Sequence, residues 1–460
     1  MYFIQRIDDV YLLTMKNLKF NIPSSYGSSM KAERIKGFRD QYPEEMEPRK
    51  RMFSIAETTA ELFGFGKIDY PSLEYLDLYR LKSGEELLNQ TFSFTDRGGR
   101  EVTMLPEATP STVRLLTSRK DIPRPVRWYS LPKIWRYEEP QSGRLREHFQ
   151  FNADIFGADT PEADAEIINL AGSILANLGL ETAFSIHIND RVIMDGILKH
   201  LGVENTDRVF TIIDRFRKTT REDFLSLLQE NGVSENGAAI LLKLVESPFE
   251  IGELRSKISE ITGKSLNLLE RVDRLSKTCD IIKQYGKSKI LVDFSVIRGI
   301  SYYTGIVFEA FDSLGQFRSI LGGGRYDNLA ALMSGQEIPA VGFGMGDVVL
   351  ELLMKREDAW KDNRKEYTYA LCFMGDTLGY SLEVAEKIRK NGIICVMELN
   401  SRGLSQQIRS AESQGFRYVL IIGEKEKEKG TVTVRDLKES SQSEKTLDDL
   451  IMSAKKYSEL

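Results

Sequence analysis

Charged side chains gather on one face of a candidate β-hairpin in residues 135–157. Side chains alternate along a strand, so Gln150 and Asp154 lie opposite the apolar residues of the second strand. Arg136 and Glu138 share a face of the first strand. Because a charged group loses hydration when it is buried, this combination indicates that a polar ligand covers the face. A half-exposed hairpin with a solvated face is the alternative, and these residues alone favour neither interpretation.

Two other segments have the chemistry to contact phosphate. Glycines 322–324 would let the backbone approach a ligand closely, although such runs also form ordinary bulges. A basic cluster at 208–221 is more typical of a solvated helix face than of a phosphate-contacting surface. Its members are Arg208, Arg215, Arg217, Lys218 and Arg221. Neither segment identifies a ligand by itself.

The composition excludes several classes of protein. The chain has 460 residues, 41% of them hydrophobic, which is enough for about two to four domains. No apolar run reaches the length of about 18 residues that a membrane span needs. The three cysteines and three histidines lack metal-ligand spacing, so we expect neither a zinc site nor a disulfide framework, and a reducing cytoplasm fits. With a net charge of −5, any contact with nucleic acid must come from local patches.

The apolar pattern predicts a large α+β part that positions these side chains. Its expected elements are helices at 44–63 and 163–178, strands at 183–188 and 290–311, and a hairpin at 92–106. Residues 191–286 are dominated by helical periodicity. Glu107 and Thr109 stand just before another helix, where a capping oxygen is favoured.

A smaller α/β part is expected after a charged linker at 355–366. Strands and helices alternate there, which predicts a mostly parallel sheet. The expected strands are 367–374, 393–397, 418–422 and 431–434, and the expected helices are 381–390 and 404–413. The run Glu424–Lys429 is expected to be a solvated turn.

Seven short segments carry a resemblance to a known family. In chain order they are GFRDQYP (37–43), IDYPSLE (68–74), LPEAT (105–109), WRYEEPQSGRLREHFQ (135–150), RGISYYTG (298–305), GGGRYDNL (322–329) and PAVGFGMG (339–346). Together they resemble the class II aminoacyl-tRNA synthetases, and within that class the histidyl-tRNA synthetase family. RGISYYTG discriminates most, because it resembles the histidine-specific signature of that family.

The resemblance implies a fold and a domain order. The implied fold is an α+β catalytic domain, with an antiparallel sheet flanked by helices, at residues 31–190 and 287–356. A helical insertion would occupy 191–286, and an α/β anticodon-binding domain 366–460. Residues 1–30 would be a peripheral N-terminal extension, since they lack the features of a signal peptide.

The resemblance also implies a two-step reaction. Histidine and ATP would form histidyl-adenylate and pyrophosphate, and the tRNA would then accept the histidyl group. Both steps develop negative charge, so positioning and electrostatics should dominate catalysis. Arg136 resembles the motif 2 contact to the α-phosphate and the carboxylate, and Arg298 resembles the family's second arginine on the same phosphate. These two are the expected catalytic residues.

ATP is expected to bind with Mg²⁺ as a substrate, without zinc. The residues implied for ATP are Arg136, Glu138, Arg144, His148 and Arg325. In the motif 3 region the family often has Gly-Leu-Glu-Arg, whereas this chain has Gly-Asp-Val-Val at 346–349. Val349 therefore stands where an ATP-binding arginine is expected. Either Arg325 or Arg318 supplies that charge, or ATP binding is weak.

The implied histidine pocket must satisfy an ammonium, a carboxylate and an imidazole. Asp154 would accept a hydrogen bond from one ring nitrogen and Tyr303 would serve the other. An unpaired buried polar group costs about 1–3 kcal/mol, which is what would exclude isosteric amino acids. The implied residues are Glu107, Ala108, Thr109, Arg136, Gln150, Asp154, Arg298, Tyr302 and Tyr303.

The implied partners are tRNA(His) and a second copy of the chain, without a membrane. The loop residues Glu139, Gln141 and Ser142 would read the acceptor end of the tRNA, and the motif 1 helix would lie in the homodimer interface. The alternative is a non-catalytic relative that acts as a regulatory subunit of ATP phosphoribosyltransferase. Only the missing motif 3 arginine favours that alternative.

Overall fold

The computed structural model describes residues 33–80, 85–262, 266–286, 288–298, 302–361, 368–399 and 403–458. The expected N-terminal extension lies outside these ranges, and so do residues 362–366 of the expected linker. None of the described helices is long and apolar enough to cross a membrane.

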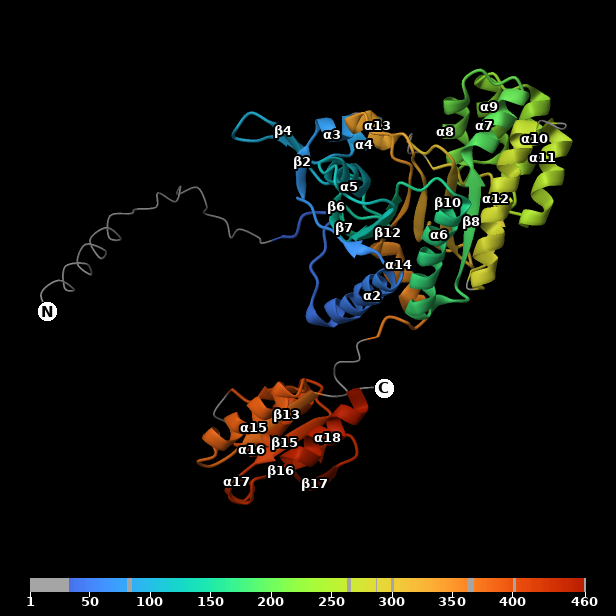
Figure 1. The fold of residues 1–460 in the computed structure, drawn as a ribbon. Coiled ribbons are helices and arrows are strands. Elements are labelled where there is room, and N and C mark those ends of the chain that lie inside the picture. Colours follow the sequence, from blue (N-terminus) through green and yellow to red (C-terminus); the bar gives the residue numbers. More distant parts are fainter. Residues whose placement is uncertain are drawn as a thin grey trace, which may run out of the picture. The chain divides into compact units, whose positions relative to one another are not determined.

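One large sheet forms the centre of the part from Gln41 to Lys361 (Figure 1). Its central strands pair antiparallel, as predicted, but the sheet is mixed, because β1 with β5 and β8 with β9 pair in parallel at its ends. The short strand β6 pairs with β7 outside the main path. In spatial order the strands are β1 (Gly66–Lys67), β5 (Val126–Ser130), β7 (Glu147–Phe156), β12 (Ala340–Gly346), β11 (Leu321–Arg325), β10 (Ile306–Asp312), β8 (Phe184–Asp190) and β9 (Ile290–Val292), with β6 at Lys133–Trp135.

The predicted alternation along β7 is confirmed. Phe151, Ala153 and Ile155 are buried in the main apolar core, because their face of the sheet is covered by helices. Two of these helices are α2 (Pro43–Leu62) and α6 (Pro161–Leu175). The opposite face carries Gln150 and Asp154, so one strand serves both the core and a polar site.

A second, three-stranded sheet and short helices complete this region. The strands run in the order β2 (Leu73–Tyr75), β4 (Glu101–Met104) and β3 (Ser93–Thr95), which confirms the predicted hairpin of β3 and β4. The accompanying helices are α3 (Asp77–Arg80), α4 (Glu85–Asn89), α5 (Ala108–Thr117), α13 (Leu329–Ser334) and α14 (Asp347–Arg356), and a π-helical turn, η1 (Ala176–Leu180), follows α6.

Residues 191–285 form helices, as their apolar period predicts, and they gather beside β8 (Figure 1). Their buried apolar side chains join the core of the large sheet. The elements are α7 (Arg191–His200), α8 (Thr206–Asp214), η2 (Phe216–Lys218), α9 (Arg221–Glu230), α10 (Glu235–Val245), η3 (Ile251–Glu253), α11 (Leu254–Thr262) and α12 (Leu266–Tyr285).

The part from Thr368 to Ser458 has its own sheet and apolar core. The predicted strands and helices form, but the sheet is not mostly parallel. β14 and β15 flank β13 in parallel, whereas β16 and β17 are antiparallel. The elements are β13 (Thr368–Phe373), α15 (Leu378–Lys390), β14 (Ile394–Met397), α16 (Leu404–Ser413), β15 (Tyr418–Ile422), α17 (Glu424–Lys429), β16 (Thr431–Asp436), β17 (Ser441–Thr446) and α18 (Leu447–Ser458).

The expected turn at Glu424–Lys429 is wrong, since this run is the short helix α17. The Glu426 carboxylate accepts a 2.9 Å hydrogen bond from the Gly423 backbone N–H, which satisfies one of the exposed amides at the helix start. Gly430 ends the helix with a left-handed φ of 68°. Capping of both ends stabilises a sequence that carries no apolar stripe.

Candidate functional site

A cavity of about 1140 Å³ lies over the polar face of the large sheet. Its floor crosses neighbouring strands, because Gln150 is in register with Gly346, Gly322 with Gly344, and Gly322 with Glu309. The glycines carry no side chains, so the floor stays open between polar walls. Arg136, Glu138 and Gln150 of the predicted polar face line this cavity, whereas Asp154 is not among its lining residues.

Arg136 and Arg298 line this same cavity, although they come from distant parts of the chain. Arg136 follows β6, and its Nε donates a 2.9 Å hydrogen bond to the Pro106 carbonyl. Its backbone N–H donates to the Arg146 carbonyl at 2.9 Å, which closes the base of the loop after β6. The guanidinium is thereby fixed on one wall with its remaining N–H groups available to a ligand.

Arg298 also lines the cavity, and its backbone has a left-handed conformation with φ of 58°. Its Nη1 lies 3.6 Å from the Glu309 carboxylate, and its Cζ lies 5.7 Å from the centre of the Tyr303 ring. Burial raises the pKa of Glu309, and the Arg298 charge opposes that rise. A methyl group added at Gly322 would overlap the Arg298 guanidinium, so this glycine makes room for it.

A cluster of buried carboxyl and hydroxyl groups adjoins Arg298. The Tyr302 hydroxyl donates to Glu107, and the Tyr326 hydroxyl donates to Asp154. Burial raises the pKa of Asp154 to about 7, and the Tyr326 hydrogen bond partly offsets it. The Tyr302 ring lies 5.2 Å from Tyr303 and 5.7 Å from Tyr326, between ring centres. Two acids and three tyrosine rings therefore form one compact group.

The start of α5 differs from its predicted capping. Glu107 occupies the N-cap position, but its side chain makes no capping hydrogen bond and turns to Tyr302 instead. Thr109 lies inside the helix and is within hydrogen-bonding reach of Tyr302, while Ala108 is buried as the first helical residue. Burial also raises the pKa of Glu107. The carboxyl is thus directed toward the site rather than toward the helix amides.

The loop between β6 and β7 ends in a tight, exposed turn. The backbones of Gln141 and Arg144 exchange hydrogen bonds of 3.0 and 2.9 Å, and Glu139, Gln141 and Ser142 are exposed. The Arg144 guanidinium pairs with the buried Glu138, and both residues line the cavity. The loop thus presents polar side chains outside the cavity and a charged pair within it.

The rings of the neighbouring residues His148 and Phe149 lie in different surroundings. His148 lines the cavity, whereas the Phe149 ring packs edge-on against Phe53 of α2 with 5.3 Å between ring centres. An amino group of Lys133 lies 5.3 Å from the centre of the same ring. His148, not its neighbour, is therefore the ring that lines the cavity.

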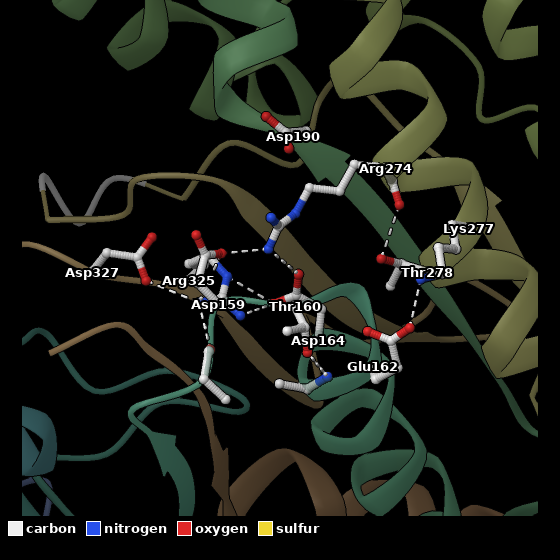
Figure 2. Close-up of polar contacts among 12 residues, drawn as sticks. Asp159, Thr160, Glu162, Asp164, Asp190, Arg274, Lys277, Thr278, Arg325 and Asp327 are labelled. Carbon is white, nitrogen blue, oxygen red and sulfur yellow. Dashed lines mark hydrogen bonds and ion pairs between the residues drawn. The ribbon is translucent and has the colours of Figure 1, made fainter. Parts of the chain in front are cut away.

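Arg325 is not among the residues that line the cavity, which argues against its expected ATP contact. Its guanidinium is 2% exposed and pairs with Asp164 at 2.6 Å and with Asp327 at 2.9 Å. Figure 2 shows it among these carboxylates and Asp159, with Arg274 of α12 reaching the same group from the other side. This residue ends β11 facing the start of α6, where carboxylates from a distant part of the chain already neutralise its charge. Of the two candidates, Arg318 is the one that lines the cavity.

In the motif 3 region, valine side chains line the cavity and the charged side chains pair behind it. Val348 and Val349 line the cavity, and a Cβ at Gly143 of the β6–β7 loop would lie 3.3 Å from the Val349 side chain. Asp347 begins α14, and its Oδ1 accepts a 3.1 Å hydrogen bond from the Phe149 backbone N–H. Its Oδ2 pairs with the buried guanidinium of Arg49 from α2, which also pairs with Glu351. A buried ion pair therefore joins α2, β7 and α14 behind the cavity.

Several cavity residues were not predicted from the sequence. The Nε2 of His187 lies 3.0 Å from the Ser185 hydroxyl, and its Nδ1 lies 2.7 Å from the Asp293 carboxylate. Arg217 donates to the same carboxylate at 2.5 Å. Only the basic cluster gave a signal for Arg217, and the apolar strand context hid the histidine. The unpredicted lining residues include Ser185, His187, Arg217, Lys218, Lys289 and Glu309.

Comparisons with known proteins show the family to which this chain belongs. The family described as Histidyl-tRNA synthetase matches residues 37–347, and the Anticodon binding domain matches residues 369–457. A Histidine–tRNA ligase of Thermoplasma volcanium is 52% identical over 92% of this chain and 98% of that protein. The one of Picrophilus torridus is 50% identical over 92% of this chain and 99% of that protein.

Solved structures show the same fold. A histidyl-tRNA synthetase from Nostoc sp. PCC 7120 has a TM-score of 0.80 at 21% identity, covering 93% of this chain and 100% of that one. A protein from Bacillus halodurans, described as an ATP phosphoribosyltransferase regulatory subunit/histidyl-tRNA synthetase, has a TM-score of 0.72 at 22% identity. It covers 86% of this chain and 99% of that one. At these identities the likeness concerns the fold alone.

Proposed function

Because the chain belongs to the histidyl-tRNA synthetase family, we propose that it is a histidine–tRNA ligase with Arg136 and Arg298 as its catalytic residues. One observation carries the assignment of these residues: both guanidiniums line one cavity, beside the buried group around Asp154 and Tyr303. The high identity to curated ligases over nearly the whole chain supports the reaction.

In the first step, a carboxylate oxygen of histidine attacks the α-phosphorus of ATP. The bond to the bridging oxygen breaks and pyrophosphate leaves, so negative charge builds on the phosphoryl oxygens. Arg136 and Arg298 both line the cavity and come from distant parts of the chain, which suits them to hold these oxygens together. Their fixed positions reduce the reorganisation that the step requires.

Selection of histidine rests on the buried acids. Asp154 would accept a hydrogen bond from one imidazole N–H, and Tyr303 would contact the other nitrogen. The Tyr326 hydroxyl already holds one Asp154 oxygen, which fixes the orientation of the carboxyl group. Glu107, Thr109 and Gln150 would bind the ammonium group, with Ala108 supplying backbone at the same helix start.

ATP would occupy the open floor and the loop side of the cavity. His148 would contact the adenine, while Arg144, Arg318 and Glu138 line the same space. Among the described residues, no three His, Cys, Asp or Glu side chains are grouped to hold a metal ion. We therefore assign Mg²⁺ to the ATP phosphates, as is usual when phosphates supply most of its ligands.

In the second step, a terminal ribose hydroxyl of tRNA(His) attacks the carbonyl carbon of the adenylate and AMP leaves. The exposed Glu139, Gln141 and Ser142 would contact the acceptor end. The match to the anticodon-binding domain at residues 369–457 supports a second tRNA contact there. A ligase of tRNA acts where translation occurs, so we propose a cytoplasmic location.

An apolar sheet face supports a homodimer. Tyr75 and Phe94 are each in register with Val102, and they are 56% and 50% exposed. Leu73 on the same face is 40% exposed, and Leu62 at the end of α2 is 80% exposed. Large apolar patches on a surface mark contact sites. A second copy of the chain is the partner that the family implies.

The regulatory-subunit alternative is not favoured. Arg136, Gln150 and Tyr303 are all present, and the chain includes a match to the anticodon-binding domain. The relatives of 50% identity or more are described as ligases. The fold of the Bacillus halodurans protein does not discriminate between the two functions.

The function is tested by ATP–pyrophosphate exchange with each of the twenty amino acids. Only histidine should support exchange, and Arg136→Ala or Arg298→Ala should lower kcat by about 10²–10³-fold, the usual loss when one transition-state donor is removed. Arg119→Ala is the matched control, because that arginine pairs with Asp121 on the surface and does not line the cavity. Exchange that persists in both cavity variants would contradict the assignment.

A further inference from the structure

Three successive carbonyl groups, the last of them that of Arg298 itself, are held by donors from one short segment. The Asn189 amide donates to the Val296 carbonyl at 3.0 Å. The Arg191 Nη1 lies 3.4 Å from the Ile297 carbonyl and 3.2 Å from the Arg298 carbonyl, and it donates to both. The end of β8 and the first residue of α7 thus form a clamp on the segment that leads into Arg298.

The held segment needs such a clamp because its last residue is strained. Arg298 has a φ of 58°, in the left-handed region that side chains other than glycine seldom adopt. A residue in that region is strained and persists when the surrounding structure over-determines it. A charged donor on its carbonyl is the strongest hydrogen bond available to impose that conformation.

Arg191 also contacts α8, the next helix of the segment 191–285. Its Cζ lies 4.6 Å from the centre of the Phe210 ring on α8, and its backbone N–H donates to the Gly305 carbonyl at 3.0 Å. The preceding residue, Asp190, caps α7 through the Val192 N–H at 2.8 Å and pairs with Arg271 of α12 at 2.7 Å. Arg191, the first residue of α7, is therefore held by contacts to α8 and to the loop that carries Arg298.

We propose that Arg191 is a positioning residue that orients Arg298 and links the helical segment 191–285 to the phosphate site. A change in the packing of α8 against Arg191 would move the Arg298 carbonyl, and with it the guanidinium in the cavity. Ligand binding on the helical segment would then alter the rate of adenylate formation. This inference rests on the proposed function, in which Arg298 contacts the reacting phosphate.

The test is ATP–pyrophosphate exchange by the full chain carrying Arg191→Met or Arg191→Lys. Misplacement of a catalytic group by about 1 Å can cost about a hundredfold. We therefore expect Arg191→Met to lower kcat by about tenfold to a hundredfold, with the KM for histidine changed by less than about threefold. Arg191→Lys keeps the charge and one donor, so it should recover part of kcat, and it carries the test if Arg191→Met does not fold. Arg208→Met, on the exposed side of α8, is the matched control and should leave exchange unchanged.

A double-mutant cycle separates positioning from general destabilisation. If Arg191 acts through Arg298, then Arg191→Met should cost little in an Arg298→Lys background, because the guanidinium to be positioned is gone. Equal losses in both backgrounds would overturn the proposal, as would wild-type kcat in folded Arg191→Met. Absence of histidine-dependent exchange in the unmodified chain would instead refute the proposed function, so the two failures are distinguishable.

A second arm tests the link to the helical segment. Phe210→Leu removes the aromatic face under Arg191 while keeping an apolar side chain at this buried position. The proposal expects a lower kcat of exchange without tRNA, and a change in the stimulation or inhibition of exchange by added tRNA. Unchanged exchange under both conditions would overturn the link.

Discussion

The Tyr326 hydroxyl donates a hydrogen bond to Oδ1 of Asp154 at the bottom of the proposed histidine pocket. Both residues are buried. Asp154 belongs to β7, and Tyr326 lies in the turn after β11. Gly342 lies directly beside the carboxyl, where any side chain would overlap it. The acid is therefore confined on two sides, and its second oxygen is the one available to an imidazole.

Activity should depend on pH through Asp154. Burial raises the pKa of this carboxyl to about 7, so it loses its proton as the pH rises through that value. We expect kcat/KM for histidine in the exchange reaction to increase over that range, because the ionised carboxylate is the stronger acceptor for a ring N–H. Asp154→Asn should remove this rise. The titration of histidine itself is common to both proteins, so an identical profile for the variant would contradict the role of Asp154.

The same group should make stability depend on pH. Its pKa is raised above the value of 3.8 in the unfolded chain, so its stabilising neutral form is fully present below about pH 4. That contribution is lost as the pH rises through about 7. Asp154→Asn stays neutral, so its melting temperature relative to wild type should rise between pH 4 and pH 8, as measured by thermal denaturation. A pH-independent difference would show that the pKa is not raised.

Alanine substitutions at two adjacent glycines of β11 should have different effects, one on catalysis and one on stability. A methyl group at Gly322 would overlap the Arg298 guanidinium, whereas one at Gly323 would overlap the Gly342 carbonyl and lie 2.7 Å from Phe343. Gly322→Ala should therefore lower kcat of exchange by about tenfold or more with little change in melting temperature. Gly323→Ala should destabilise the sheet by about 1–3 kcal/mol. The opposite pattern, from paired kinetics and denaturant unfolding, would refute the placement of Arg298.

Substitution of Arg318 should weaken ATP binding, whereas substitution of Arg325 should lower the stability of the fold. Arg318→Met should raise the KM for ATP by about tenfold or more, because a cation on the cavity wall is lost. Arg325→Met should instead cost about 3–5 kcal/mol of stability, because it leaves Asp164 buried without its main partner. Exchange kinetics and chemical denaturation measure the two effects. A raised KM for ATP in a well-folded Arg325→Met protein would restore the role expected from the sequence.

The sequence predicted the polar sheet face well because alternation along β7 is a local property. It also placed Arg136 and Arg298 in one site through their motifs. It misplaced Arg325, since neutralisation by Asp164 depends on contacts between distant elements. His187 was missed for the same reason: its role follows from cross-strand register with Glu309, which the sequence does not reveal. The polar strand β17 was missed because its side chains show no apolar alternation.

Removal of residues 365–460 should hurt tRNA charging far more than adenylate formation. The C-terminal part has its own sheet and apolar core, so the remaining chain keeps every cavity residue. Loss of one of two linked binding modules typically lowers apparent affinity by about 10²–10⁴-fold. Exchange should stay within about threefold of wild type while aminoacylation falls by about 10²-fold or more. Equal losses in the two assays would contradict a separate anticodon-binding module.

Charges on the apolar sheet face should dissociate the proposed homodimer. Tyr75→Glu or Phe94→Glu would place a carboxylate in an interface that must exclude water, which is costly without a partner. Sedimentation velocity should show a monomer for these variants and a dimer for the wild type. Leu227→Glu, on α9, is the control and should remain dimeric. A monomeric and fully active wild type would remove the dimer proposal.

The buried Arg49 has a consequence for attempts to rebuild motif 3. Its guanidinium is 1% exposed and depends on Asp347, the residue that replaces the family's leucine at the start of α14. Grafting the common Gly-Leu-Glu-Arg into this chain would remove the Asp347 partner of Arg49, leaving its contacts to Glu351 and Gln41, and would release the Phe149 N–H from its acceptor. An arginine could therefore be restored at position 349 by itself, but the tetrapeptide could not be exchanged as a unit unless α2 were redesigned with it.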